Sequence, residues 1–350
     1  MNKLTKVGCS ALCGSLAAIS AANAGDLTVT GGADMTWVSL SEAVTGNPIG
    51  IGSNLSFKGS GELDNGWTVD LTIAHTNKGA FSAAVVDLGL GGLGKINFNQ
   101  GDSANGIQAY DDKMPTAWEE AHGAGLATGA RPMVAGVGPS SNVQYTFPVF
   151  AGTTLAVAYA PAVGNTDNSD KGGGGDSKTA AAAEGIDVTV NVNPSFGTEI
   201  LSGLNLFAGA SEIKQYTNGA ADDHKNQATV GYTFDIGPLS IGGQTSAEYT
   251  GESGPTAAFN VYKASMFGIA FNVSDDLSIS YGTVESRQAG YTHNTVQHNA
   301  RVIKVDSVQA AYTMGGASMR IAQVSAENIL FSNSTSADRD ATIISLGLAF

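Results

Sequence analysis

The residues of this chain that could do chemistry gather in one stretch, from Gly101 to Pro139, which has neither a strand pattern nor a tight-turn pattern. Loops of this length are usually either functional or disordered, and two aromatic residues, Tyr110 and Trp118, favour one defined conformation here. The acidity of the mature chain suits a soluble surface or a route for cations. The stretch carries five carboxylates: Asp102, Asp111, Asp112, Glu119 and Glu120.

Motifs for enzymatic chemistry are absent from the sequence. It contains no Gly-x-Ser-x-Gly nucleophile elbow and no His-Glu-x-x-His zinc helix. His293 and His298 share a predicted loop, but no cysteine or carboxylate cluster lies nearby to complete a metal site. The run from Asp167 to Asp176 lacks the spacing and the terminal Glu of a calcium loop, so we interpret it as a flexible surface loop. We therefore predict that the protein is not an enzyme and uses no metal or cofactor.

The amino end predicts an exported protein. Lys3 and Lys6 precede a short apolar segment, and Ala22-Asn23-Ala24 supplies the small residues of a cleavage site. We predict a signal peptide over residues 1–24, whose apolar core is too short to span a bilayer. Both cysteines lie within it, so the mature chain has none. A lipid-attachment box at Cys13 is the alternative, which the preceding residues fit poorly.

The mature chain, residues 25–350, is acidic and rich in glycine. Loss of the two leader lysines lowers the formal charge from -14 to -16, which argues against nucleic acid as a partner. The whole chain has 46 glycines and only 9 prolines, and its mean hydropathy is close to zero. No mature segment has the roughly eighteen consecutive apolar residues of a membrane helix. Two classes remain, a secreted β protein and a transmembrane β-barrel, whose strands hide their hydrophobicity in alternation.

Apolar and polar residues alternate along most of the mature chain. In the segment 67–75, the odd positions from Trp67 to Ile73 are apolar. The three residues that separate them, Thr68, Asp70 and Thr72, are polar, so one face of the strand is apolar and the other is polar. Helical spacing fails in all such segments. We predict about sixteen strands: 27–39, 50–62, 67–76, 83–90, 93–100, 141–147, 153–160, 186–193, 203–212, 226–235, 238–248, 256–273, 277–285, 301–313, 317–327 and 340–350.

Short and long connections alternate between these strands. Tight turns such as Asp64-Asn65-Gly66 are of the type that hairpins use, and the longer polar connections include 101–140 and 286–300. Only the turn at 194–202 is longer than the rule allows. This asymmetry indicates an up-and-down barrel with short periplasmic turns, and closure of the barrel removes the free sheet edges.

The last predicted strand ends in an aromatic residue, Phe350. Together with the export signal, the alternating strands and the long third loop, it resembles the general porins of Gram-negative bacteria, closest in style to those of alphaproteobacteria. The resemblance covers the mature chain, although the third loop lacks the Pro-Glu-Phe-Gly-Gly-Asp signature of enterobacterial porins.

The resemblance implies an all-β, up-and-down, antiparallel transmembrane barrel. It implies that the loop at 101–139 folds into the lumen as a constriction, and that Phe350 is the signal for outer-membrane assembly. It also implies a homotrimer surrounded by outer-membrane lipid. Gly31 and Ala33 lie on the outward phase of the first strand, where small residues permit close approach of a neighbouring subunit, although a closure seam explains them equally well.

If the apolar faces meet lipid, the opposite phase lines the lumen. This phase places Lys58, Asp70, Lys95 and Arg320 on the channel wall. The resemblance implies that the loop carboxylates face the three wall bases and create a transverse field, whereas the alternative is a solvated wall that only keeps the lumen wet. Within the loop, Thr116 and Glu119 have the spacing of a capping box, which predicts a turn or two of helix.

These observations together predict a water-filled channel in the outer membrane. Small hydrophilic solutes and ions would cross it by passive diffusion, with a mild preference for cations that we infer from the negative charge of the chain. Three alternatives stay open: a substrate-selective channel with the same fold, a secreted glycine-rich β adhesin, and an enzymatic barrel of the outer membrane.

Overall fold

The computed structural model describes most of the chain outside the amino-terminal leader. The predicted signal peptide, Asp102 and the terminal Phe350 lie outside the described residues. The described residues are 27–41, 48–77, 83–100, 105–131, 134–163, 184–194, 201–214, 224–251, 259–292, 295–332, 334 and 337–349.

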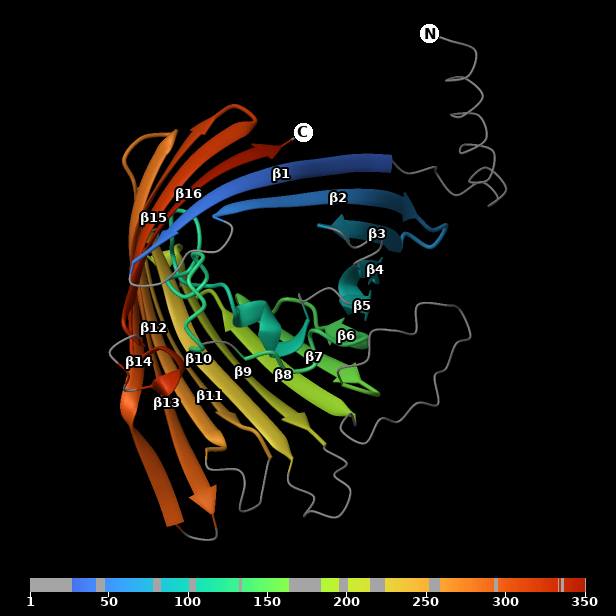
Figure 1. The fold of residues 1–350 in the computed structure, drawn as a ribbon. Coiled ribbons are helices and arrows are strands. Elements are labelled where there is room, and N and C mark those ends of the chain that lie inside the picture. Colours follow the sequence, from blue (N-terminus) through green and yellow to red (C-terminus); the bar gives the residue numbers. More distant parts are fainter. Residues whose placement is uncertain are drawn as a thin grey trace.

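Sixteen strands in this part of the chain form one closed sheet, which surrounds an interior space (Figure 1). The strands are β1 (Leu27–Leu40), β2 (Ile49–Glu62), β3 (Thr68–Thr76), β4 (Ala83–Gly89), β5 (Lys95–Gln100), β6 (Asn142–Thr146), β7 (Thr153–Ala160), β8 (Gly185–Val192), β9 (Leu204–Ile213), β10 (Lys225–Ile236), β11 (Leu239–Tyr249), β12 (Val261–Asn272), β13 (Leu277–Thr292), β14 (Thr295–Met314), β15 (Ala317–Glu327) and β16 (Arg339–Ala349).

Each strand pairs antiparallel with its neighbours in the sequence, and β1 pairs with β16 to close the barrel. The closing register runs from Gly32 opposite Ala349 to Leu40 opposite Ala341. The predicted all-β, up-and-down barrel of sixteen antiparallel strands is thus confirmed. Closure leaves no unpaired sheet edge at the seam, which a membrane-spanning sheet requires.

Side chains of the wall alternate between an outward apolar face and an inward face. In β8, Ile186 and Val188 are 46% and 44% exposed, whereas Asp187 between them is fully buried. In β15, Met319 and Ile321 are exposed on either side of Arg320. The outward set is the apolar band that a bilayer would cover, because successive residues of a strand point to opposite faces.

Short turns connect neighbouring strands at one end of the barrel, and several of them depend on glycine at a defined position. Gly66, Gly237 and Gly315 have positive φ angles of 79°, 58° and 57°, a backbone conformation that favours glycine. Among the described residues, no helix is long and apolar enough to span a membrane. Helical structure there consists of short 3-10 turns, of which η2 (Gly106–Tyr110) matters most for the interior.

The predicted loop at 286–300 is wrong. Strand β13 continues to Thr292 and β14 begins at Thr295, with a register shift between Arg287 and Ala289. His298 therefore lies in β14, and His293 lies outside the described residues. Backbone hydrogen bonds between the two strands extend the hairpin. Such pairing does not require apolar and polar residues to alternate, so a strand that is polar on both faces is not detected by its sequence pattern.

Candidate channel site

The chain between β5 and β6 lies against the inner face of the wall, and we call residues 105–140 the inner loop (Figure 1). Its backbone has little regular structure, so its N–H and C=O groups need other partners. Wall side chains on β8, β10, β11, β13 and β14 provide many of these partners. The contacts are Ile107 N and Val137 N to Asp187, Gly136 N to Gln227, Gln244 Nε2 to Tyr110 O, Ala117 N to Ser280, Arg131 N to Ser286 and Glu119 N to Gln309.

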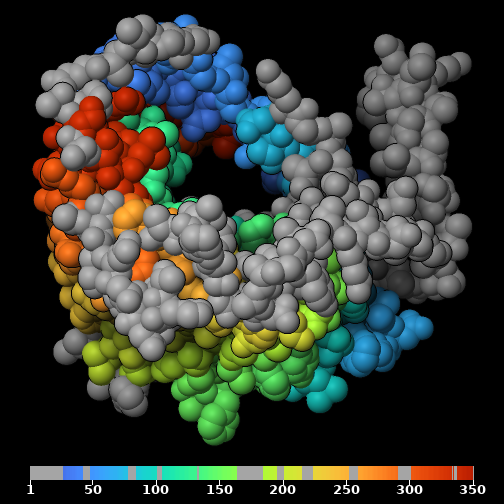
Figure 2. All heavy atoms as spheres, turned by 60° about the horizontal axis from the view of Figure 1, so that its bottom comes forward, coloured from blue at the N-terminus to red at the C-terminus, as the bar shows by residue number. Residues whose placement is uncertain are grey.

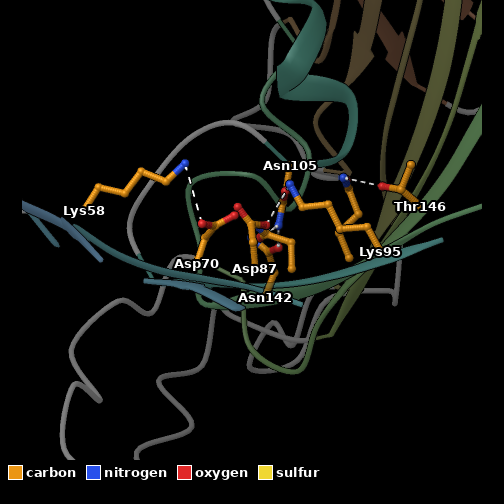
Figure 3. A network of polar contacts seen from close by, with 9 residues as sticks. Lys58, Asp70, Asp87, Lys95, Asn105, Asn142 and Thr146 are labelled. Atoms are coloured by element: carbon orange, nitrogen blue, oxygen red, sulfur yellow. Dashed lines mark hydrogen bonds and ion pairs between the residues drawn. The ribbon is translucent and has the colours of Figure 1, made fainter. Parts of the chain in front are cut away.

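A network of amides holds the start of the inner loop (Figure 3). Asn105 donates from Nδ2 to Asn97 on β5 and to Asn142 on β6, each at 2.7 Å. The amide of Gly106 donates to Gln144 on β6 at 2.8 Å. Since these partners belong to the two strands that the loop connects, they fix the direction in which the chain enters the barrel.

An apolar cluster joins the inner loop to the inward faces of β12 to β16. The ring of Tyr110 stacks on that of Phe207, with the centroids 4.8 Å apart. Met114, Ala121 and Leu126 are buried in the same cluster. Its wall members are Met266, Val284, Ile303, Val305, Ala322, Val324, Ala326, Ala341 and Ile343. This part of the wall is apolar on both faces, because the loop covers the side that water would otherwise wet.

The capping box at Thr116 and Glu119 does not form, and that prediction is wrong. The Thr116 hydroxyl donates to the carbonyl of Glu119 at 2.6 Å, and the amide of Glu119 donates to Gln309 Oε1 at 2.9 Å. Gln309 Nε2 also donates to the carbonyl of Glu119 at 2.6 Å. The segment is a bend rather than a helical turn, because Gln309 of β14 forms hydrogen bonds with both the amide and the carbonyl of Glu119.

The substitution Gln309→Leu should loosen this bend. It removes the partner of the Glu119 amide and one of the two partners of the Glu119 carbonyl, which keeps the Thr116 hydroxyl, and each lost hydrogen bond costs about 0.5–1.5 kcal/mol. We expect faster amide hydrogen exchange in residues 114–122, measured by mass spectrometry on the folded protein. The control is Gln323→Leu, since Gln323 contacts Thr342 rather than the loop. Unchanged exchange in Gln309→Leu would contradict the anchoring role.

Glu120 is buried within the loop rather than directed at the wall bases. Its side chain is 6% exposed, and Oε1 accepts the Met114 amide at 2.9 Å. Oε2 lies 3.7 Å from Nδ1 of His122, and neither atom has a hydrogen-bond partner within the described part of the chain. Burial raises the pKa of Glu120 to about 8 and lowers the pKa of His122, so both side chains are largely neutral at pH 7.

The other loop acids are more exposed. Burial, followed by repulsion from Asp112, raises the pKa of Asp111 to about 6. Partial desolvation and Asp112 raise the pKa of Glu119, whereas the Arg320 guanidinium opposes that rise. Asp112 and Glu119 are exposed, which leaves them as the described loop acids best placed to meet a passing ion.

The wall bases pair with acids of the wall rather than with the loop. Lys58 Nζ lies 3.9 Å from Asp70, and Lys95 Nζ lies 2.8 Å from Asp87 (Figure 3). The two pairs come from β2 to β5 and face the interior. In a water-filled space such pairs contribute little stability, so their main effect is on local charge.

Arg320 is the predicted wall base that the structure brings to the loop. Its guanidinium lies 2.8 Å from Asp34 and 5.9 Å from the ring centroid of Trp118. Sequence reasoning missed Asp34 and Asp87 as wall acids. Both sit on the inward phase of their strands, beside outward apolar residues, so the same alternation that identified Asp70 could have identified them.

A cavity of about 770 Å³ lies between the loop and the strands β1, β2, β15 and β16. Figure 2 shows an opening through the molecule, bordered by the blue atoms of β1 and β2 and by green atoms of the inner loop. The charged residues of the cavity lining are Asp34, Glu119 and Arg320, which gives a net charge of one negative. The remaining lining includes hydroxyl and amide side chains, such as Thr30, Asn54, Thr76, Asn77 and Ser318.

Across the described residues, no group of three or more His, Cys, Asp or Glu side chains is arranged to hold a metal ion. The features that distinguish the interior of this part of the chain are its charged side chains and its cavity. A closed barrel with an apolar outer band, a polar opening and a loop against its inner wall defines the class of channel-forming outer-membrane barrels.

Residues 8–350 match the family model described as Gram-negative porin, and the chain belongs to this family. No curated protein matches the chain. Salmonella typhi OmpF in complex with daunomycin is 15% identical over 93% of this chain and 98% of its own, with a TM-score of 0.65. Vibrio cholerae OmpT, folded in vitro, is 13% identical over 95% and 100%, with a TM-score of 0.64. A porin structure refined at 1.8 Å is 14% identical over 93% and 100%, with a TM-score of 0.63. At these identities the likeness concerns the fold.

Proposed function

We propose that this porin is a diffusion channel for small hydrophilic solutes and ions, with a mild preference for cations. The observation that carries the proposal is the opening beside the inner loop, whose lining of Asp34, Glu119 and Arg320 has a net negative charge. The inner loop would narrow the passage, because it covers inward side chains from β8 to β16 and leaves space along β1, β2 and the ends of β15 and β16 near Arg320 and Gly347.

The wall pairs support the same function. Lys58, Asp70, Asp87 and Lys95 keep the interior polar along β2 to β5, opposite the half of the barrel that the loop covers. A polar lining lowers the cost of moving a hydrated solute through the barrel. The opposed charges that a transverse field requires are concentrated at Arg320 and Glu119.

The remaining parts of the proposal concern export and assembly. Residues 1–24 would be removed as a signal peptide, and Phe350 would serve recognition by the assembly machinery. The mature barrel would form a homotrimer, and a solved structure of Vibrio cholerae OmpT is itself described as a trimer form. The protein would be of the alphaproteobacterial type of general porin, which is the type that its export signal, alternating strands, long third loop and terminal Phe350 most resemble.

Planar-bilayer recording tests the proposal directly. Purified, refolded protein should produce stepwise conductance increases, and the reversal potential in a salt gradient should favour cations. An anion-favouring reversal potential would contradict the selectivity, and saturable block by one solute class would favour a substrate-selective channel instead. Absence of any conductance from heat-modifiable, folded barrels would contradict the channel itself.

A further inference from the structure

We propose that Asp187 is a positioning residue that ties the two ends of the inner loop together and so fixes the bore of the channel. This inference rests on the proposed function, because it concerns the loop that would narrow the passage. Asp187 comes from β8, far in sequence from the loop that it contacts. Its side chain points to the inner face and is fully buried.

One carboxylate oxygen of Asp187 receives both limbs of the loop. Oδ2 accepts the amide of Ile107 at 2.9 Å and the amide of Val137 at 3.0 Å. Ile107 lies near the start of the loop and Val137 lies near its end. Between these two points the chain extends across the barrel to β14 and returns. Asp187 therefore holds the two ends of this segment together, and we call its contact with the two amides the neck of the inner loop.

The local sequence is built to allow this close approach. Each of the two amides follows a glycine with a positive φ angle, 63° at Gly106 and 55° at Gly136. A Cβ atom added at Gly106 would lie 2.0 Å from Asp187 Oδ2, and one at Gly136 would lie 2.1 Å from it. Glycine is therefore required at both positions by space as well as by conformation.

Other contacts hold single limbs or lie at the end of the loop itself. Gln144 receives the amide of Gly106, and Gln227 receives that of Gly136. Asn142 contacts both limbs, but it directly follows the return limb and can move with it. Asp187 differs because a single carboxyl oxygen fastens both limbs to a strand that belongs to neither, through two hydrogen bonds from backbone amides.

Loss of the two hydrogen bonds to Asp187 would let the two limbs separate, and it would increase the amplitude of motion of the segment between them. That segment includes Trp118 and Glu119, which lie beside Arg320 at the opening. The expected consequence is a fluctuating bore with an intact barrel. A carboxylate with a purely structural role in the wall would instead lower barrel stability without a change in open-channel noise.

The test compares Asp187→Ala with Asp187→Asn in single-channel recordings. Alanine removes the acceptor, so we expect at least a tenfold rise in closure frequency at a fixed voltage and faster hydrogen exchange throughout 107–137. Asparagine keeps one acceptor oxygen, so it should restore most of the wild-type behaviour. Glu212→Gln is the control, since Glu212 pairs with His224 away from the loop.

Two further measurements keep the outcome decisive. Heat-modifiable migration on a gel reports whether each variant has closed its barrel, and Gly136→Ala offers a second route if Asp187→Ala does not fold, because it displaces the limb and leaves Asp187 in place. Closure frequency and exchange equal to wild type in the folded variants would overturn the proposal. If wild-type protein forms no channel, the proposed function fails, whereas the exchange measurement still decides whether Asp187 is the neck.

Discussion

Replacing Glu120 with glutamine should abolish an alkaline weakening of the inner loop. Burial holds the pKa of Glu120 near 8 in the folded loop, against an ordinary value of 4.5. The folded loop therefore binds this proton more tightly than the unfolded loop does. Its stability is greatest below pH 4.5, falls as the pH rises towards 8, and has lost the full contribution above that, a difference on the order of several kcal/mol.

Hydrogen exchange measures this loss locally. After correction for the intrinsic rate, residues 107–131 of the wild-type protein should lose protection progressively between about pH 5 and pH 8, and Glu120→Gln should keep its protection over the same range. The neutral amide can still accept the Met114 N–H, so the substitution removes the charge and keeps the contact. Glu212→Gln serves as the control because Glu212 is exposed and pairs with His224 away from the loop. Identical pH profiles in wild type and Glu120→Gln would refute the explanation.

Neutralising the exposed carboxylate of Glu119 should shift ion selectivity towards anions. Glu119 lines the opening with Asp34 and Arg320, so its removal changes the net charge of the lining from one negative to zero. A unit charge at about 4 Å in water attracts a cation and repels an anion by about 1 kcal/mol each. Its removal therefore changes the cation-to-anion permeability ratio by about 2 kcal/mol, which corresponds to roughly a thirtyfold fall. The reversal potential of Glu119→Gln in a salt gradient measures this change.

Glu120→Gln is the matched control for selectivity, since the two residues are adjacent and only one lines the opening. At pH 7 it should leave the reversal potential unchanged, because the buried carboxyl is already mostly protonated. Equal shifts of the reversal potential from Glu119→Gln and Glu120→Gln would contradict the assignment of Glu119 alone to the ion path. No shift from either would place Glu119 outside the path.

The wall was predictable because its signal is local. A strand that is apolar on one face and polar on the other alternates in sequence, and the positions of Lys58, Asp70, Lys95 and Arg320 on the inward face followed from that period. The prediction failed where the period carries no information. β13 continues to Thr292 and β14 begins at Thr295, although the residue types of this part of the hairpin do not distinguish it from a loop.

The inner loop was predictable only as a location. Its length and its acids marked the segment between the fifth and sixth strands, but the expectation that all its carboxylates face the wall bases was too simple. Glu120 is buried against Met114, and Lys58 and Lys95 pair with Asp70 and Asp87 on the wall. Pairing and burial depend on neighbours brought together from distant strands, which residue spacing cannot rank.

The sequence by itself determined that the strands of this chain alternate between apolar and polar residues, and that one long acidic connection interrupts them. Those properties depend on composition and on a period of two, which each segment carries independently. Only the tertiary structure decided which acids meet which bases, and that Asp187 on β8 receives the amides of Ile107 and Val137. The physical reason is barrel closure, which brings strands that are distant in sequence around one interior, where a loop without a backbone period is held by their side chains.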